Sequence, residues 1–153
     1  RNQIFRLPKQ IVDLKNLSAL YLRENNIKSL PKDIGNLKNL TKFSMESNEL
    51  RSLPNSIGKL KRLNSLWLSG NKLDSLPNSI LNLKNLDGLF LYGNELIYVP
   101  PNICNLNDSL DLRLSSNNLC DQYFFECVND FYPQNQSNCC QGKNGKLNWK
   151  PCP

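Results

Sequence analysis

Apolar residues recur along the chain in the pattern LxxLxLxxNxLxxLPxxIxxL, which repeats every 23 residues. Two apolar residues that are two positions apart point to one face of a strand, and the residue between them points to the other face. Each LxL segment therefore predicts a short strand with one apolar and one outward face. One period is too short to bury its own leucines, so successive periods are expected to stack and share a continuous core.

Polar residues and prolines follow the same period. An asparagine after each LxL segment recurs as Asn2, Asn25, Asn48, Asn71, Asn94 and Asn117. Its side chain offers both a donor and an acceptor, so stacked asparagines can form a ladder that satisfies the backbone where the coil leaves the sheet. A Leu-Pro or Val-Pro pair recurs as Leu7-Pro8, Leu30-Pro31, Leu53-Pro54, Leu76-Pro77 and Val99-Pro100. Proline lacks an N–H, which suits the part of the coil outside the sheet.

Segments such as SLPKDIGNLKNL and SLPNSIGKLKRL resemble the leucine-rich repeat family. They are similar to the 23-residue repeats of Ras-group-like plant proteins, their animal scaffold relatives and many bacterial or protist proteins. The resemblance covers residues 1–119, which would hold about five repeats. It implies an α/β-type solenoid, a curved right-handed superhelix with short parallel strands on its concave face. The convex side would be irregular or 3₁₀, and the role would be binding.

The pattern changes at both ends of the repeats. The chain starts at a ladder asparagine whose own strand is absent, which predicts an open strand edge preceded by further repeats or a capping module. Near the other end, the segment 106–110 departs from the template, because Ser109 stands where a leucine is expected and Leu110 follows it. The register returns at Leu112, and irregular sequence is usual in a last repeat.

Residues 120–153 lose the repeat and predict a cysteine-rich C-terminal cap. Asp121 can cap the N-terminus of a helix, and Pro133 lies beyond its expected end. The apolar residues of this helix recur at i, i+3, i+4 and i+7, as Phe124, Cys127, Val128 and Phe131. Such a helix would cover the leucines of the final coil.

All the cysteines lie in the last third of the chain, as Cys104, Cys120, Cys127, Cys139, Cys140 and Cys152. An even number gathered at one end favours a disulfide-stapled cap and an oxidising compartment. Cys104 and Cys127 are one period apart, and stacked strands lie about 5 Å apart, within the range of a disulfide. We therefore expect a Cys104–Cys127 bridge, while the order of the other pairs stays open. A four-cysteine zinc site is the alternative, although the chain lacks paired CxxC knuckles.

The outward strand positions form three columns. The central column is Tyr21, Ser44, Trp67, Phe90 and Arg113; the next is Arg23, Glu46, Ser69, Tyr92 and Ser115; the one before is Ala19, Lys42, Ser65, Gly88 and Asp111. Aromatic side chains in an exposed concavity are typical of interaction hot spots. Aromatics also favour strands and pair across them for structural reasons alone, and both interpretations stay open. Gly70, Gly88 and Gly93 border the aromatics and are expected to leave the backbone open. The candidate partner-binding residues are Tyr21, Arg23, Trp67, Phe90, Tyr92 and Arg113.

The net charge of +6 has its own pattern. A lysine precedes each of the first four expected strands, as Lys15, Lys38, Lys61 and Lys84. This row is expected to be a solvated flank, with contact to an acidic surface as the alternative. Nucleic-acid binders gather such charge on one face beside stacking aromatics, and this chain does not, so no nucleic-acid partner is expected.

Several residue patterns narrow the functional class. The chain has no histidine and no nucleotide-binding or nucleophile-elbow motif, so we expect no enzyme, cofactor or metal. No apolar run is long enough for a bilayer, so no direct membrane insertion is expected. Sequons for N-linked glycans begin at Asn16, Asn39, Asn107 and Asn135.

The sequence as a whole predicts a non-catalytic, secreted or cell-surface module that recognises or adheres to a protein or glycan through its concave face. Two alternatives remain. The chain would otherwise be a structural subunit of a larger cell-surface assembly, or a cytosolic scaffold with reduced thiols and no glycan.

Overall fold

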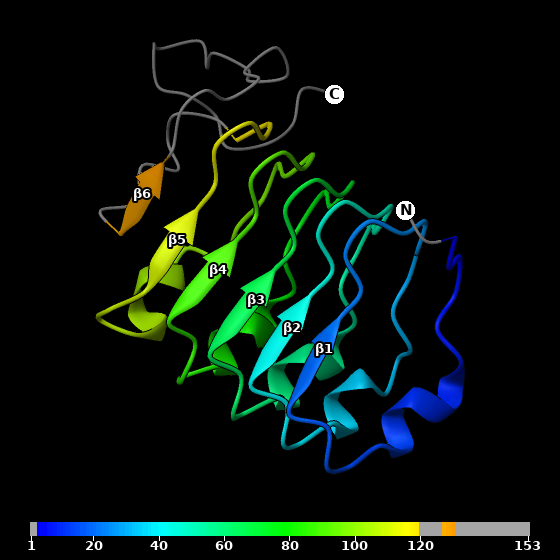
Figure 1. Ribbon diagram of the computed structural model, residues 1–153. Coiled ribbons are helices and arrows are strands. Elements are labelled where there is room, and N and C mark those ends of the chain that lie inside the picture. Colours follow the sequence, from blue (N-terminus) through cyan, green and yellow to red (C-terminus); the bar gives the residue numbers. More distant parts are fainter. Residues whose placement is uncertain (1–2, 120–126, 131–153) are drawn as a thin grey trace, which may run out of the picture.

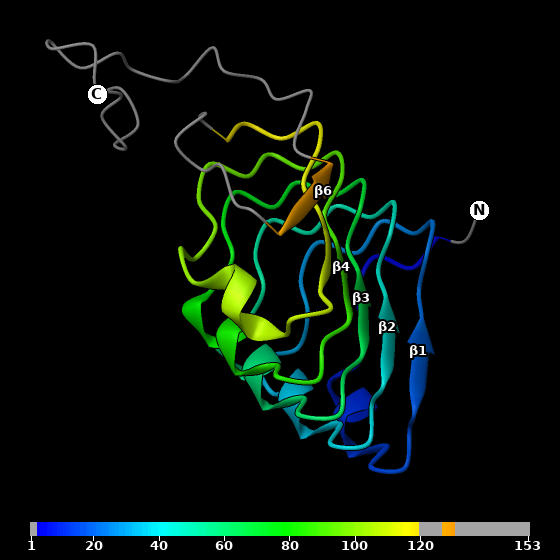
Figure 2. The ribbon, with the colours of Figure 1, turned by 90° about the vertical axis from the view of Figure 1, so that its left-hand side faces the viewer.

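The computed structural model describes residues 3–119 and 127–130. Within these residues, short parallel strands form one sheet in sequence order: β1 (Ala19–Tyr21), β2 (Lys42–Ser44), β3 (Ser65–Trp67), β4 (Gly88–Phe90), β5 (Asp111–Arg113) and β6 (Val128–Asp130). A 3₁₀ helix precedes each of the first five strands: η1 (Lys9–Asp13), η2 (Ile34–Asn36), η3 (Asn55–Lys59), η4 (Asn78–Asn82) and η5 (Ile103–Leu106). The strands lie side by side in Figure 1, and Figure 2 shows the 3₁₀ helices stacked in a separate row. The predicted solenoid is confirmed.

Neighbouring strands pair with a register of one period. Trp67 pairs with Ser44 on one side and with Phe90 on the other, and Phe90 pairs in turn with Arg113. The outward columns therefore follow the order expected from the sequence, and we call the side of the sheet that carries them the strand face. The apolar residues between the outward residues point the other way, into one core that runs through the coils. From Phe43 to Leu114 they are fully buried, whereas Leu20 and Leu22 of the first coil are partly buried.

The asparagine ladder joins each coil to the one before it. The Oδ1 of Asn71 accepts a hydrogen bond from the Leu50 N–H at 2.9 Å, and its Nδ2 donates to the carbonyls of Met45 and Leu68, both at 2.9 Å. Asn48, Asn94 and Asn117 repeat this set, and all are buried. Burying an amide without partners is costly, so these bonds fix the turn that ends each strand.

Two glycines allow the 3₁₀ helices to pack closely. A Cβ at Gly35 would collide with the carbonyl oxygen of Ser56 in η3, and one at Gly58 with that of Ser79 in η4. Because these neighbours are backbone atoms, no side-chain movement can relieve the collision. Glycine at this slot therefore sets the distance between η2, η3 and η4.

The last repeat keeps its core despite its irregular sequence. Leu110 is buried and Ser109 is exposed, so the leucine one position later fills the place in the core. The Asn107 side-chain oxygen accepts hydrogen bonds from the backbone N–H and the hydroxyl of Ser109, both at 3.2 Å. This local turn absorbs the shift in register.

The C-terminal segment holds one confirmed prediction and one correction. A Cys104–Cys127 disulfide joins Cα atoms 5.5 Å apart, as expected for residues one period apart. The expected helix is wrong at Val128–Asp130, which forms β6 and pairs with β5 through a register shift. The open edge of β5 offers backbone partners to a segment that the disulfide holds beside it, and this outweighs the helical spacing of the apolar residues.

Other predictions for this end of the chain fall outside the described residues. They concern the rest of that helix, the cysteines Cys120, Cys139, Cys140 and Cys152, and the sequon at Asn135. The division at residue 120 between repeats and cap also stays a prediction. No helix in the described ranges is long and apolar enough to cross a membrane.

Candidate functional site

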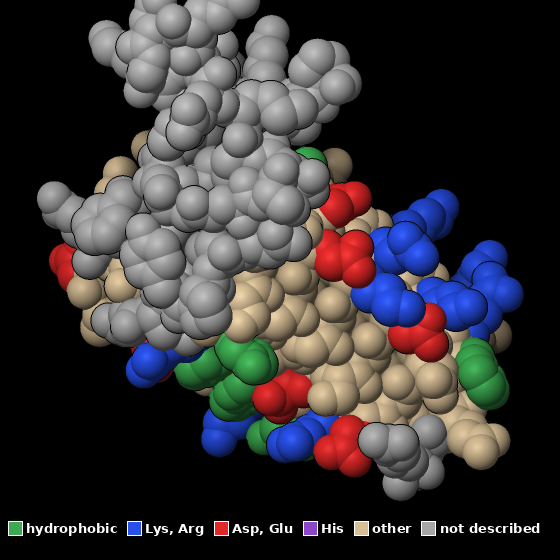
Figure 3. Space-filling model, turned by 90° about the horizontal axis from the view of Figure 1, so that it is seen from above, with side chains coloured by type: hydrophobic (Ala, Val, Ile, Leu, Met, Phe, Trp, Pro, Cys, Tyr) green, Lys and Arg blue, Asp and Glu red, His purple; other side chains and the backbone are tan. Residues whose placement is uncertain are grey.

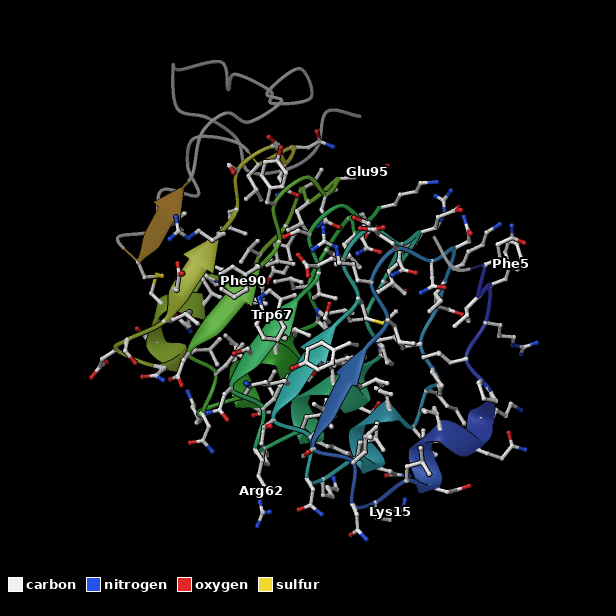
Figure 4. All side chains as sticks on the ribbon, in the orientation of Figure 1. Phe5, Lys15, Arg62, Trp67, Phe90 and Glu95 are labelled. Atoms are coloured by element: carbon white, nitrogen blue, oxygen red, sulfur yellow. A yellow bond between two sulfur atoms is a disulfide. The ribbon has the colours of Figure 1, made fainter. Side chains whose placement is uncertain are left out.

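An aromatic cluster lies on the strand face over β3 and β4. Trp67 and Phe90 are register partners, and their rings are almost parallel, with an interplanar angle of 7° and centroids 5.9 Å apart. This distance is typical of an offset stack. Figure 4 shows the two side chains beside each other on the same side of the sheet. Tyr92 follows β4 and is 53% exposed. We call Trp67, Phe90 and Tyr92 the aromatic strip.

The position of the Phe90 ring depends on Gly88, two residues earlier on β4. A Cβ at Gly88 would lie 2.7 Å from Cε2 and 3.0 Å from Cζ of the Phe90 ring. Gly88 is buried under this ring, so the expectation that it leaves the backbone open is wrong. Its neighbours in the same column carry side chains, as Ala19, Lys42, Ser65 and Asp111.

The glycines that follow β3 and β4 are explained by their backbone conformation. Gly70 and Gly93 have φ values of +67° and +65°, in the left-handed region that favours glycine. Ser47 and Ser116 adopt the same conformation in their coils, with φ of 53° and 55°. The backbone turn is therefore common to the repeats, and the absence of side chains beside the aromatic strip is particular to β3 and β4.

The other candidate residues surround the aromatic strip without joining it. Tyr21 is 60% exposed, and the buried Ser44 on β2 lies between it and Trp67 in the central column. Arg23 forms an ion pair with Glu24 at 3.2 Å, beyond β1. Arg113 pairs with Asp111 at 2.7 Å and is the register partner of Phe90. The structure therefore stacks two of the six candidates, Trp67 and Phe90, with Tyr92 two residues beyond Phe90 and Arg113 paired with Phe90 on the next strand.

The lysine row has a structural role that the sequence analysis missed. The ammonium groups of Lys38, Lys61 and Lys84 donate to backbone carbonyls of Lys59, Asn82 and Asn105 at 3.4, 3.0 and 3.1 Å. Each acceptor lies in the next 3₁₀ helix, where the terminal carbonyls lack helical partners. The signal in the sequence was the identity of the residue in successive periods, which points to contacts between coils. Figure 3 looks from above onto the other edge of the coils, where Glu95 lies in Figure 4, and there acidic and basic side chains lie next to one another.

The sequons in the described residues differ in their surroundings. Asn16 is exposed, and its side chain has no hydrogen bond within the described ranges. Asn39 donates from Nδ2 to the Lys15 carbonyl at 2.8 Å and accepts from Arg62 at 2.7 Å. The Nδ2 of Asn107 donates to Asp87 at 2.7 Å. Because a glycan attaches through Nδ2, Asn16 offers the least hindered acceptor of these three.

Within residues 3–119 and 127–130, no group of three or more His, Cys, Asp or Glu side chains is placed to hold a metal ion.

Comparison with known proteins agrees with the geometry. A family model described as a leucine-rich repeat region matches residues 1–71, and one described as Leucine Rich Repeat matches residues 62–83. A search of curated protein sequences found no significant match. Many solved structures match with significance.

Three solved structures illustrate the similarity. A leucine-rich repeat protein of Leptospira interrogans is 40% identical over 77% of this chain and 30% of its own, with a TM-score of 0.72. An internalin, InlF, of Listeria monocytogenes is 26% identical over 87% of this chain and 40% of its own, with a TM-score of 0.71. A plant ice-binding protein is 33% identical over 74% of this chain and 38% of its own, with a TM-score of 0.66.

The chain thus spans between 30% and 40% of the length of these structures. Family models and solved structures point to the same repeat, whose members typically mediate protein–protein interaction and are typically non-catalytic. The chain belongs to the leucine-rich repeat family.

Proposed function

We propose that this chain is a non-catalytic recognition module that binds a protein partner through its strand face, with the aromatic strip at the centre of the contact. The observation that carries this proposal is the stacked Trp67–Phe90 pair on the outward side of the sheet. These rings add nothing to the leucine core, which lies on the other side of the strands. Aromatic side chains that are held rigid before binding contribute contact area at little entropic cost, and they dominate binding energy in many interfaces.

Charge supports an apolar contact in preference to an electrostatic one. The charged residues of the outward columns carry both signs, as Arg23, Lys42, Glu46, Asp111 and Arg113. The lysine row lies on a different part of the coil, where three of its ammonium groups bond to backbone carbonyls. Binding through the aromatic strip should therefore depend weakly on salt, whereas an acidic partner on the lysine row would lose affinity steeply.

The test compares the double variant Trp67→Ala/Phe90→Ala with wild-type protein. The partner is first captured from the native source and purified, and its dissociation constant is then measured by calorimetry. We expect the double variant to bind about 30-fold more weakly, as for a hot spot worth about 2 kcal/mol. Tyr98→Ala is the matched control, because Tyr98 is an exposed aromatic residue outside the strand face and should change affinity less than about twofold. Equal affinity of the double variant and wild type would overturn the proposal.

Two further measurements distinguish the proposed contact from alternative ones. Raising salt from about 0.05 to about 0.5 M should change affinity little. A steep loss of affinity would indicate that the partner binds the lysine row. Removing glycans from the purified partner should leave affinity unchanged. Loss of binding after that treatment would assign a glycan as the ligand.

We also propose that the protein acts outside the cell, as a recognition or adhesion module. The Cys104–Cys127 disulfide supports this, because disulfides persist in oxidising compartments. Intact mass of native protein, before and after reduction and deglycosylation, tests it. Bound glycan, first of all at Asn16, and oxidised cysteines are the expected result. Reduced thiols without glycan would favour a cytosolic scaffold, and a native form held in a large cell-surface complex would favour a structural subunit.

A further inference from the structure

A cavity of about 400 Å³ lies far from the aromatic strip, between η1 and the segment that leads into η2. Its floor contains the buried side chains of Leu7 and Leu30. Arg6, Lys9 and Lys32 stand around it together with Asp33. This volume is within the range of small-molecule sites in proteins. The first two 3₁₀ helices, blue and cyan in Figure 1, flank this joint.

The sequence gives a cause for the width of this joint. Gly35 and Gly58 bring η2, η3 and η4 into close contact, because a Cβ at either position would strike a backbone carbonyl of the next helix. The same slot in η1 holds Val12, which lines the cavity. Its branched side chain makes an equally close approach to the Asp33 carbonyl impossible.

A hydrogen bond supports the same conclusion independently. Lys38, Lys61 and Lys84 each reach across to a carbonyl of the following 3₁₀ helix. Lys15 is the equivalent residue at the first joint, and it donates to the carbonyl of Val12 in its own coil at 2.8 Å. The bridge that ties the later coils together is therefore not formed between η1 and η2.

The cations around the cavity outnumber the acidic groups that line it. Within residues 3–119 and 127–130, Arg6, Lys9 and Lys32 form no ion pair and no side-chain hydrogen bond. Asp33 supplies only one negative charge against three positive ones. Guanidinium and ammonium groups that line one cavity can bind phosphate and sulfate oxygens through charge-assisted hydrogen bonds.

We infer that this joint is a binding site for a small organic anion, with a phosphate or sulfate ester group on the three cations and its carbon body on the apolar floor. The site is separate from the aromatic strip, and its occupancy does not depend on the function proposed there.

Calorimetry of the whole chain at low ionic strength tests this site with three probes: phenyl phosphate, phenyl sulfate and inorganic phosphate. Phenyl phosphate should bind about tenfold more tightly than inorganic phosphate, because its ring covers Leu7 and Leu30. Tighter binding of phenyl phosphate than of phenyl sulfate assigns phosphate esters as the ligand class, and the reverse order assigns sulfate esters. Equal affinity of phenyl phosphate and inorganic phosphate, or no binding of any probe at about 10 mM, overturns the inference.

Charge variants separate a built site from general attraction to a basic protein. Lys9→Gln and Lys32→Gln should each weaken phenyl phosphate binding about fivefold, and Asp33→Asn should strengthen it. Lys59→Gln is the matched control, since Lys59 is an exposed lysine in η3 that does not line the cavity, and its replacement should leave affinity unchanged. An equal loss of affinity from Lys59→Gln and Lys9→Gln would show that binding depends only on net charge, and it would overturn the proposed site.

Shape variants test the joint without changing any charge. Val12→Gly should let η1 approach the next coil as Gly35 and Gly58 do, which closes the cavity and weakens phenyl phosphate binding about fivefold. Val12→Leu keeps a bulky residue at the slot, as Leu81 does in η4, and should bind as wild type does. Thermal melting verifies that both variants are folded. Wild-type affinity in a folded Val12→Gly variant would contradict the proposed site.

Discussion

The asparagine ladder and the central outward column run side by side through the same coils, yet they follow opposite rules. The ladder carries the same residue in every coil, and each described side chain from Asn48 to Asn117 is buried and bonded to two coils. The central column changes from Tyr21 through Ser44 and Trp67 to Phe90 and Arg113. Tyr21 is exposed, Ser44 is buried, and the other three are partly exposed. In a solenoid, a residue that never changes serves the contact between coils, and a residue that changes is free to serve a partner.

The largest expected effect comes from removing one ladder asparagine. Asn71→Ala leaves the Leu50 N–H and the carbonyls of Met45 and Leu68 without their buried partner. We expect the free energy of unfolding to fall by about 3 kcal/mol, measured by urea denaturation. Asn82→Ala is the control, because Asn82 is exposed in η4, and it should cost less than about 0.5 kcal/mol. Similar losses in both variants would break the distinction between the ladder and other asparagines.

The second prediction concerns Gly88, whose importance comes from its effect on the aromatic strip. Gly88→Ala places a Cβ against the Phe90 ring, which can move, whereas no backbone atom is struck. We expect stability to change by less than about 0.5 kcal/mol, while the Trp67–Phe90 stack opens and affinity for the protein partner falls about tenfold. Trp67 fluorescence in a Trp149→Phe background reports the stack, since the chain has two tryptophans.

A double-mutant cycle separates this positioning role from a general structural one. In a Phe90→Ala background, Gly88→Ala should have no further effect on Trp67 fluorescence or on binding, because the ring it displaces is gone. Ser65→Ala is the control at the same position of β3. An unchanged Trp67 spectrum in Gly88→Ala would show that the Phe90 ring accommodates the added Cβ without leaving the stack, which would contradict this positioning role.

Except for the lysine bonds between coils, the sequence predicted the features that the 23-residue period places one coil apart, and it failed where a single local contact decides the structure. The strand register, the ladder and the Cys104–Cys127 bridge all follow from the 23-residue period alone. The strand at Val128–Asp130 was not predicted, because the spacing of its apolar residues also fits a helix. The segment forms a strand because it pairs with the edge of β5. The cover of Phe90 over Gly88 depends on a rotamer, which no pattern of residue types encodes.

The third prediction uses a position where the repeat tolerates strain. Ser47 has a φ of 53°, the conformation that Gly70 holds in the next coil. Ser47→Gly should raise the free energy of unfolding by about 0.5 to 1 kcal/mol, because glycine adopts left-handed backbone without a steric cost. Thermal unfolding measures the gain, and Ser52→Gly, at an exposed serine outside the left-handed region, is the control and should destabilise slightly. A loss of stability in Ser47→Gly would mean that the serine side chain matters more than its backbone.

The smallest effect is expected from the ion pair between Glu49 and Lys72, which joins two adjacent coils at 3.2 Å on the partly exposed edge beside the ladder. The hydrogen bond from Lys72, with a weaker one from Asn26, lowers the pKa of Glu49 below its usual value. A carboxyl whose pKa is lower in the folded protein stabilises the fold above its unfolded pKa, and that contribution is lost as the pH falls through the folded pKa.

The melting temperature of wild type should therefore exceed that of Glu49→Gln slightly at neutral pH. The difference should shrink at acid pH and also at high salt, because an exposed pair is screened. A difference that persists in acid would instead assign the effect to the shape of the side chain. Hydrogen bonds and packing between coils would then determine stability at this edge, as they do in the ladder, and charge would not.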